Sequence, residues 1–285
     1  MSIKHFIKSI TSSKQRNQIR KFKRNIKKRL FPKSKTSLAE LKNILIQDFG
    51  LRKGDNIIVA SSFGNLNANY SPQDVIQLLQ SIVTEEGSIM MPYYPPINST
   101  EWVKTSNIFD MERTKSGMGI LTNIFSKMPG VVKSIHPIKA VCVWGKNAKE
   151  IISNHENSTT PFYWDSPYGK YLKIHSKSLG LGLKNIPIFH AFEDILSKPY
   201  DTYYQKEKYT LFVKNGNNAF PIKTYVHDND ILDRCISAGD YVASLKCKTY
   251  KKINFGYTFL YVIDNDELYQ RLQIEFKNGN TRIKK

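Results

Sequence analysis

The stretch that decides the fold is residues 110–145, DMERTKSGMGILTNIFSKMPGVVKSIHPIKAVCVWG. It predicts a helix opened by glycine, a turn at Pro129-Gly130, and a strand from Lys139 to Trp144 that Gly145 closes. His136 directly precedes Pro137, just before this strand. Because proline fixes its own φ and restricts the residue before it, the backbone holds this histidine stiffly. Such a histidine suits a positioned base, and it equally suits a simple turn, so both interpretations stay open.

The segments on both sides of this stretch alternate strands with helices. A short buried strand ends in the small-residue loop Ser61-Ser62-Phe63-Gly64, and Ser71-Pro72 then opens a helix. This strand covers residues 56–60, and the other predicted strands cover 88–91, 178–183, 208–213, 219–226, 241–248 and 255–262. The turn Asn215-Gly216-Asn217 predicts a hairpin, and Gly180 and Gly182 inside a strand indicate a close approach by a ligand or another backbone. The capping box Ser37-Leu-Ala-Glu40 opens the first helix of the body, and further helices cover 188–196, 230–237 and 264–276. This alternation predicts one mixed α/β domain over residues 37–285, with a central sheet flanked by helices and a β-richer C-terminal third.

The composition is that of an ordinary globular protein. Among 285 residues, 40% are apolar and 24% are charged, and no apolar run is long enough to span a bilayer. The three cysteines are too few for a disulfide framework or a zinc knuckle, so we expect buried thiols in a reducing compartment. The six histidines are dispersed, and no metal site is expected.

The net charge of +19 is unevenly placed. Residues 1–35 carry thirteen lysines or arginines and no acid, so the remaining 250 residues have a net charge of only +6. Apolar residues recur at helical spacing among the basic ones, at Ile19, Phe22, Ile26 and Leu30. We therefore predict a basic amphipathic helical extension over residues 1–36.

Several roles for this extension compete. A basic helix with an apolar stripe suits an anionic membrane surface, which would place the protein in the cytoplasm at the inner face of a membrane. The same helix could dock on a partner protein or on its own body, or form a passive tail. Nucleic acid is not expected as a partner, because the body shows no nucleic-acid-binding module.

His190 and Glu193 are three residues apart on the predicted helix 188–196, so they share a face. A glutamate one turn from a histidine can orient the imidazole and stabilise its charged form. An ordinary surface ion pair is the competing interpretation. A single HxxE copy does not support a di-iron site, which uses two copies and two further glutamates.

A series of motifs follows in order through the middle of the chain. They are Val59-Ala-Ser-Ser-Phe63, Gly87-Ser-Ile-Met-Met-Pro92, Phe109-Asp110 with Arg113-Thr114, Gly119-Ile-Leu-Thr-Asn-Ile-Phe125, Pro129-Gly130 with Ser134-Ile-His-Pro137, Asp165-Ser-Pro-Tyr-Gly169, and Leu181-Gly182 with His190-Ala-Phe-Glu193. From about Gly54 to Asp194 the chain resembles the aminoglycoside 3-N-acetyltransferase family. The C-terminal third fits this pattern only loosely, and the basic extension has no counterpart in it.

The resemblance implies transfer of an acetyl group from acetyl-CoA to the amino group of a sugar. A sugar ammonium must lose a proton before it attacks a thioester, and a histidine suits that task. His190 or His136 would be the base, with Glu193 orienting His190.

The resemblance also implies where the two substrates bind. The backbone of Ser61, Ser62 and Phe63 would receive the oxyanion and the pantetheine. Lys133 and Ser134 would contact the CoA, with Lys133 meeting a phosphate. Asp110 and Asp165 would hold the acceptor.

The chain departs from the family pattern at three places. Ala60 stands where the family usually has histidine, and Ile138 and Ala140 stand where it usually has threonine and serine. These losses favour an amino sugar of a surface polysaccharide, or its nucleotide-linked precursor, over an aminoglycoside antibiotic. Antibiotic acetylation remains an alternative, and so does a catalytically degenerate scaffold subunit of a membrane-associated assembly.

Overall fold

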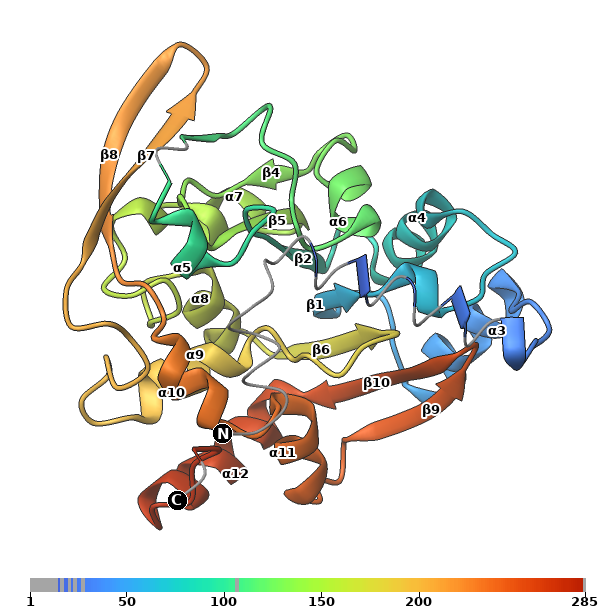
Figure 1. Ribbon diagram of the computed structural model, residues 1–285. Helices are drawn as coiled ribbons and strands as arrows, with labels where there is room; N and C mark the ends of the chain where they lie inside the picture. The colour runs from blue at the N-terminus through green and yellow to red at the C-terminus, as the bar shows by residue number, and fades with distance from the viewer. Residues whose placement is uncertain are drawn as a thin grey trace.

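The computed structural model describes residues 15, 18, 19, 22, 25, 26, 29–105 and 108–283. Its centre is a seven-stranded sheet with the strand order β4-β5-β2-β1-β6-β10-β9 (Figure 1). The strands are β1 (Asn56–Ser61), β2 (Ser88–Tyr93), β4 (Val132–Lys133), β5 (Ala140–Gly145), β6 (Ser176–Leu181), β9 (Lys251–Phe255) and β10 (Thr258–Asp264). The three middle strands β2, β1 and β6 are parallel, and their outer neighbours β5 and β10 are antiparallel to them. The predicted mixed α/β domain with a central sheet is confirmed.

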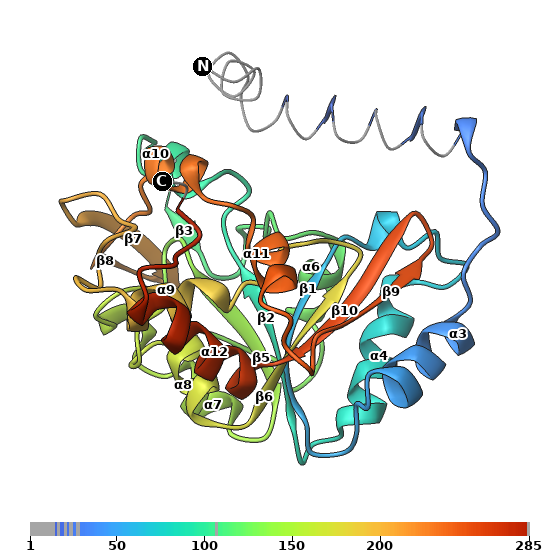
Figure 2. The same cartoon turned by 90° about the horizontal axis from the view of Figure 1, so that it is seen from below.

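Helices cover both faces of this sheet (Figure 2). One face carries α3 (Leu38–Asn43) with the π-helical turn Ile44–Asp48, α4 (Pro72–Val83) and α6 (Ile120–Phe125). The other face carries α7 (Ala148–Ile152), α8 (Pro167–Lys173), α9 (Phe189–Leu196), α11 (Ala238–Ser244) and α12 (Asn265–Lys277). Short helices α5 (Ser99–Trp102) and α10 (Asn229–Arg234) and the 3-10 turns Phe63–Asn65 and His155–Asn157 lie in the connections. Alternate residues of β1 pack into the two separate cores, which explains why the strand reads as a continuous apolar run.

Local sequence fixes the start of the first helices. Ser37 caps α3 and Ser71 caps α4, and each forms a reciprocal capping box with the residue three positions later. Pro72 occupies the first turn of α4, where its missing N–H is not needed. Both predicted helix starts are confirmed.

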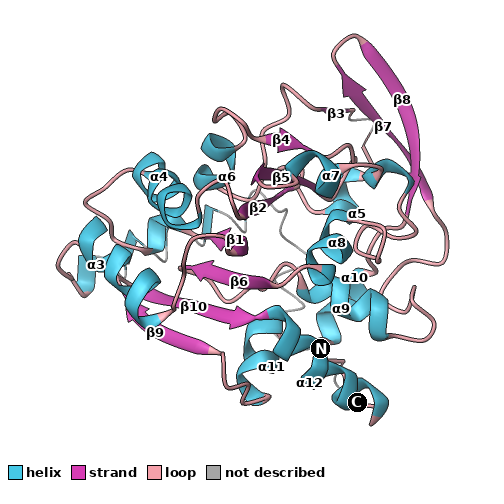
Figure 3. Ribbon diagram, turned by 180° about the vertical axis from the view of Figure 1, so that it is seen from behind, coloured by secondary structure: helices cyan, strands magenta, loops and turns pink. Residues whose placement is uncertain are grey.

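A second, three-stranded sheet stands apart from the central one (Figure 3). It contains β3 (Phe109–Asp110), β7 (Tyr209–Asn215) and β8 (Asn218–Thr224), and β7 and β8 form the hairpin predicted around Gly216. This sheet therefore joins the central stretch of the sequence to the C-terminal third.

The strand predicted over residues 241–248 is wrong, because this segment belongs to α11 and the turn after it. Ser237 accepts a hydrogen bond from the N–H of Asp240 and begins the helix. The apolar residues Tyr241 and Val242 then pack into the core beside α9 and α12. A short apolar run is compatible with strand or helix, and the cap decided between them.

Gly180, in the middle of β6, leaves room for an aromatic ring. A Cβ at this position would lie 1.8 Å from Cε1 of Tyr261 on the neighbouring strand β10. The glycine suggested a close approach by a ligand or another backbone, and the structure shows a side chain instead.

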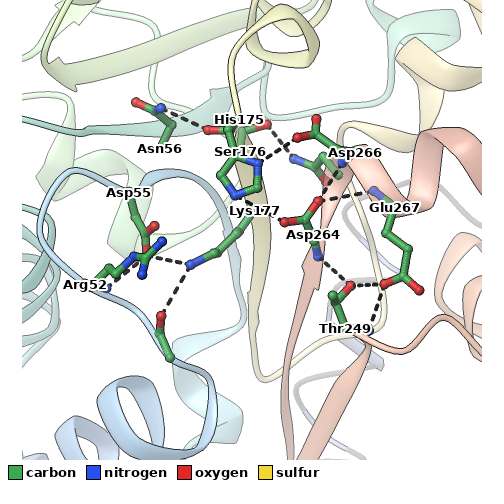
Figure 4. Close-up of polar contacts among 12 residues, drawn as sticks. Arg52, Asp55, Asn56, His175, Ser176, Lys177, Thr249, Asp264, Asp266 and Glu267 are labelled. Atoms are coloured by element: carbon green, nitrogen blue, oxygen red, sulfur yellow. Dashed lines mark hydrogen bonds and ion pairs between the residues drawn. The ribbon is translucent and has the colours of Figure 1, made fainter.

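Polar contacts close the edge of the sheet where β1 and β6 begin (Figure 4). Lys177 forms an ion pair of 2.8 Å with Asp55, and the carboxylate of Asp55 also accepts the N–H of Arg52. His175 lies between two carboxylates, 2.6 Å from Asp266 and 3.3 Å from Asp264. These contacts tie the start of β6 to α12 and to the loop before β1.

The predicted amphipathic extension lies mostly outside the described residues. Where it is described, Ile19, Phe22, Ile26 and Leu30 are helical and exposed, at 41%, 66%, 41% and 65%. Within the described chain, none of the helices combines the length and apolar character needed to cross a bilayer.

Candidate active site

Three side chains from distant parts of the chain form a linear relay. His190 and Glu193 lie one turn apart on α9, and Nδ1 of His190 is 2.9 Å from Oε2 of Glu193. Arg282, in the C-terminal segment, donates from Nε and Nη2 to the two carboxylate oxygens of Glu193, at 2.5 and 2.9 Å. Such a bidentate (two-pronged) contact fixes the orientation of the carboxylate plane more firmly than a single hydrogen bond does. The surface ion pair considered for His190 and Glu193 does not occur, because the Glu193 side chain is fully buried.

The relay sets the protonation of its members. Burial alone would raise the pKa of Glu193, but the hydrogen bond from His190 and the charge of Arg282 outweigh it and the pKa lies below its usual value. Burial lowers the pKa of His190, and Arg282 and Lys139 act in the same direction while Glu193 opposes them. At neutral pH the site therefore holds a glutamate anion beside a neutral imidazole.

These protonation states decide which nitrogen of His190 is basic. The carboxylate can only accept, so Nδ1 carries the proton and Nε2 carries the lone pair. No described residue forms a hydrogen bond with Nε2, and the His190 side chain is 26% exposed. The arrangement is that of an oriented base whose free nitrogen is open to a substrate.

Aromatic rings surround the base. The His190 ring lies 5.1 Å from that of Phe162 and 4.5 Å from that of His227, measured between centroids. Tyr204 stacks on His227 with 4.6 Å between the ring centroids. Nε2 of His227 is buried and finds no hydrogen-bond partner among the described residues.

A buried carboxyl and a lysine complete the surroundings. Asp194 accepts hydrogen bonds at Oδ2 from the hydroxyls of Thr160 and Tyr204, and its Oδ1 finds no partner in the described part of the chain. Burial raises the pKa of Asp194 well above its usual value, while the hydrogen bonds from Thr160 and Tyr204 and the charge of Lys139 act in the opposite direction. Lys139, at the start of β5, lies with Nζ 4.5 Å from the ring centroid of Tyr94 and 5.8 Å from that of Phe162.

The second candidate base, His136, has other partners. Its Nδ1 accepts the N–H groups of Ile138 and Lys139 at 3.2 and 3.0 Å, so Nε2 carries the proton and donates to Thr224. Burial, together with the nearby His155 and Lys139, holds the pKa of His136 well below its usual range. Because two backbone N–H groups already occupy its lone pair, this histidine stabilises the turn before β5.

Ser134 belongs to the same buried turn. Its hydroxyl accepts the N–H of Val141 at 2.9 Å and lies 2.8 Å from Nδ1 of His155. The ring of His155 packs against that of His136 at 4.5 Å. Because Ser134 is fully buried, its hydroxyl serves this network rather than a surface open to CoA.

The loop after β1 offers backbone donors. The N–H of Ser62 donates to the carbonyl of Leu181 at 2.8 Å and is therefore occupied. The N–H groups of Phe63 and Gly64 have no backbone acceptor among the described residues. Ser61 is the last residue of β1 and lies at the same edge of the sheet as the start of β5. Lys139 directly precedes β5, and the strand β2 lies between β5 and β1.

Lys133 lines a separate cleft of about 540 Å³, together with Lys127, Lys149 and Glu112. Its ammonium donates to the carbonyl of Met111 at 2.5 Å and lies 3.9 Å above the ring of Tyr93. Burial lowers its pKa.

The two candidate acceptor-binding aspartates hold local backbone. Oδ1 of Asp110 accepts the N–H groups of Glu112 and Arg113, both at 2.9 Å. Oδ2 of Asp165 accepts the N–H and hydroxyl of Thr159 at 2.9 and 2.8 Å, while its Oδ1 finds no partner in the described chain. The structure does not join either carboxylate to the relay.

Two charged residues of this site, Arg282 and Lys139, were not predicted from the sequence. Arg282 lies in a polar tail with no motif around it, and only the folded chain brings it to Glu193, 89 residues away in sequence. Lys139 carried a usable signal, because it is a charged residue placed directly before the buried run Ala140–Val143.

This chain is similar to known proteins in sequence and in fold. The family model described as aminoglycoside 3-N-acetyltransferase matches residues 58–276. The chain is 30% identical over 154 residues to the SPbeta prophage-derived aminoglycoside N(3')-acetyltransferase-like protein YokD of Bacillus subtilis, covering 47% of this chain and 54% of YokD. It is 25% identical over 186 residues to aminoglycoside N(3)-acetyltransferase IX of Micromonospora chalcea, covering 56% of this chain and 64% of that protein. The matched segments thus span less than two thirds of either relative.

Solved structures share the fold. The YokD crystal structure superposes with a TM-score of 0.68 at 20% identity, covering 87% of this chain and 96% of that one. The structure described as AAC-IIIb binary with CoASH gives a TM-score of 0.67 at 17% identity and covers 86% of this chain and 98% of that one. With the family model matched over most of the chain and the fold shared, this protein belongs to the aminoglycoside 3-N-acetyltransferase family.

Proposed function

We propose that this protein transfers an acetyl group from acetyl-CoA to an amino group of a sugar, with His190 as general base. The observation that carries the proposal is the relay Arg282–Glu193–His190, which leaves Nε2 of His190 unprotonated and open. Membership of the family and the CoA named in the AAC-IIIb structure support acetyl-CoA as the donor.

The relay assigns each proton in the reaction. Nε2 of His190 takes a proton from the sugar ammonium, and the freed amine attacks the thioester carbonyl. Glu193 balances the charge that forms on the imidazole. When the tetrahedral oxyanion collapses, the C–S bond breaks and the imidazolium of His190 gives its proton to the CoA sulfur. The neutral imidazole then takes the remaining extra proton from the nitrogen and releases it to solvent, so the products are the amide, the CoA thiol and one proton. The free N–H groups of Phe63 and Gly64 are the donors we assign to the oxyanion.

We propose an amino sugar of a surface polysaccharide, or its nucleotide-linked precursor, as the acceptor. The aspartates expected to hold a cationic acceptor, Asp110 and Asp165, bind local backbone instead. The names of the two relatives favour an aminoglycoside as the second candidate acceptor.

The test is thiol release from acetyl-CoA against amino sugars, nucleotide-linked amino sugars and aminoglycosides. We expect His190→Ala to lower kcat/KM by about 10²–10⁴, the usual contribution of a general base. His136→Ala should lower the thermal stability. The fraction of this variant that remains folded should keep more activity than His190→Ala keeps. If His190→Ala turns over like the wild type, the base is misassigned. If the wild type neither binds CoA nor releases thiol, the scaffold alternative replaces the enzyme.

We further propose that the basic extension places the protein on an anionic membrane at the cytoplasmic face. Its described apolar residues Ile19, Phe22, Ile26 and Leu30 are exposed, and residues 1–35 carry thirteen positive charges. Flotation with vesicles of anionic lipid should recover the full chain and leave a chain lacking residues 1–35 at the bottom. Equal flotation of both proteins, or of neither, would remove the proposal.

A further inference from the structure

Lys139 is the charged residue beside the base that the relay does not use. It follows the turn of His136 and precedes β5, where its ammonium lies 4.5 Å from the Tyr94 ring and 5.8 Å from the Phe162 ring. The Phe162 ring in turn lies 5.1 Å from that of His190. The Phe162 ring thus neighbours both the ammonium and the proposed base.

This ammonium has no ionic partner. Within the described chain, no carboxylate forms an ion pair with Lys139 and no oxygen accepts a hydrogen bond from it. Asp194 is the acid whose field reaches Lys139, and burial raises the pKa of that carboxyl well above its usual value. The Lys139 side chain contacts aromatic rings instead.

The site around His190 is consequently positive. The charges of Glu193 and Arg282 cancel in their two-pronged contact, which leaves Lys139 as the uncompensated ion among the groups acting on His190. Burial lowers the pKa of Lys139 to about 8, so it is charged at pH 7. A part-buried cation without a counter-ion is costly, and that cost is recovered when a ligand supplies an anion.

Two buried polar atoms in the same region also lack partners. They are Nε2 of His227, whose ring lies 4.5 Å from that of His190, and Oδ1 of Asp194. Buried polar groups in folded proteins are almost always hydrogen-bonded, so unpaired ones beside a reactive group point to a ligand.

On the basis of the proposed acetyltransferase function, we infer that Lys139 selects amino-sugar acceptors that carry a negatively charged group, a phosphate or a carboxylate, and disfavours polycationic aminoglycosides. The anion cannot be the diphosphate of CoA, since the long pantetheine arm keeps that group far from the thioester at which His190 acts. A polycation in this site would place ammonium groups beside Lys139, whose own charge forms no ion pair with a carboxylate of the described chain.

A matched set of acceptors tests the inference, with the enzyme at pH 7. Glucosamine, glucosamine 6-phosphate and muramic acid present the same amine with no anion, a phosphate and a carboxylate, and sisomicin represents the polycations. We expect the wild type to prefer the anionic acceptors, and Lys139→Met to lower kcat/KM for them about 10- to 100-fold, the range for loss of a charged hydrogen bond. Glucosamine should change less than about threefold. Lys139→Glu should raise turnover of sisomicin relative to the anionic acceptors.

Lys252→Met is the matched control, because Lys252 also packs over an aromatic ring, 4.1 Å from Phe259, but on the edge strand β9. Its acceptor preference should equal that of the wild type. An equal loss on all four acceptors in Lys139→Met would assign Lys139 to the thioester or to the fold and overturn the inference. A wild type that prefers glucosamine to its phosphate would overturn it as well.

A separate binding experiment distinguishes failure of the anion-selecting role of Lys139 from failure of the proposed acetyltransferase function. If the wild type releases no thiol with any acceptor, the acetyltransferase proposal fails. Calorimetric titration with glucosamine 6-phosphate and with glucosamine then tests the anion site alone. Tighter binding of the phosphate that Lys139→Met abolishes would support the site, and equal binding would reject it.

Discussion

At the scale of single residues, Arg282 decides how the base is held. It reaches Glu193 from the far end of the chain and makes both of its strong contacts to that one carboxylate. Its side chain is 8% exposed and that of Glu193 is fully buried, so removing either partner leaves an uncompensated charge in the interior. Arg282 does not touch the reacting atoms in the proposed mechanism and acts through Glu193, as a positioning residue.

We expect Arg282→Gln to change the pH profile and the stability together. The charge of Arg282 lowers the pKa of His190, so its loss should move the acidic limb of kcat/KM to higher pH. Leaving the buried Glu193 without its arginine partner should cost about 3–5 kcal/mol in urea unfolding.

Arg282→Lys keeps the charge and should retain most of the wild-type pH profile. The control is Arg271→Gln, which removes a partly exposed i,i+4 pair with Glu275 at 2.8 Å and should cost no more than about 0.5 kcal/mol. A large stability loss in Arg282→Gln with an unmoved acidic limb would reduce Arg282 to a structural role.

At the scale of elements, the contact between β6 and β10 depends on the absence of a side chain. The Tyr261 ring fills the space over Gly180, and its hydroxyl donates to the carbonyl of Asn185 in the loop that leads to α9. The same contact thus packs two strands and holds the segment that carries His190.

Gly180→Ala should therefore lower the free energy of unfolding by about 1–3 kcal/mol, the usual cost of overpacking a core. It should also reduce activity, because the displaced ring releases the loop before α9. In a Tyr261→Leu background the same change should cost much less, and this double-mutant cycle isolates the contact. Additive losses in unfolding experiments would show that the glycine is needed for another reason.

At the scale of the whole molecule, His136, His155 and His227 are buried in the folded protein, and burial disfavours their protonated forms. Burial lowers the pKa of His155 to about 3, and it lowers those of His136 and His227 well below the usual value. In the unfolded chain these histidines bind protons near pH 6.5. The unfolded state therefore binds more protons below that pH, and the protein loses stability as the pH falls.

Each such histidine contributes a slope of about 1.4 kcal/mol per pH unit between its unfolded and its folded pKa. We expect His155→Gln to be less stable than the wild type at pH 7, yet to lose less stability between pH 6.5 and pH 5. Urea unfolding at both pH values measures the two slopes. Parallel lines for wild type and variant would show that His155 is not the titrating group.

The local sequence was enough to determine most of the elements and the order in which they occur. Capping boxes at Ser37 and Ser71, the hairpin at Gly216 and the apolar runs of the central strands act within a few residues, so they can be read without the fold. The helix over residues 238–244 was missed because a short apolar run fits either structure, and the cap at Ser237 that decides for the helix was not recognised in the sequence.

In the candidate site too, the sequence predicts some contacts and not others. His190 and Glu193 lie one helical turn apart, so their pairing was visible in the sequence. The contact from Arg282, the occupied lone pair of His136 and the unpaired ammonium of Lys139 were decided only by the tertiary structure. The physical reason is that protonation and charge balance depend on burial and on partners tens of residues away, and neither is encoded in local spacing.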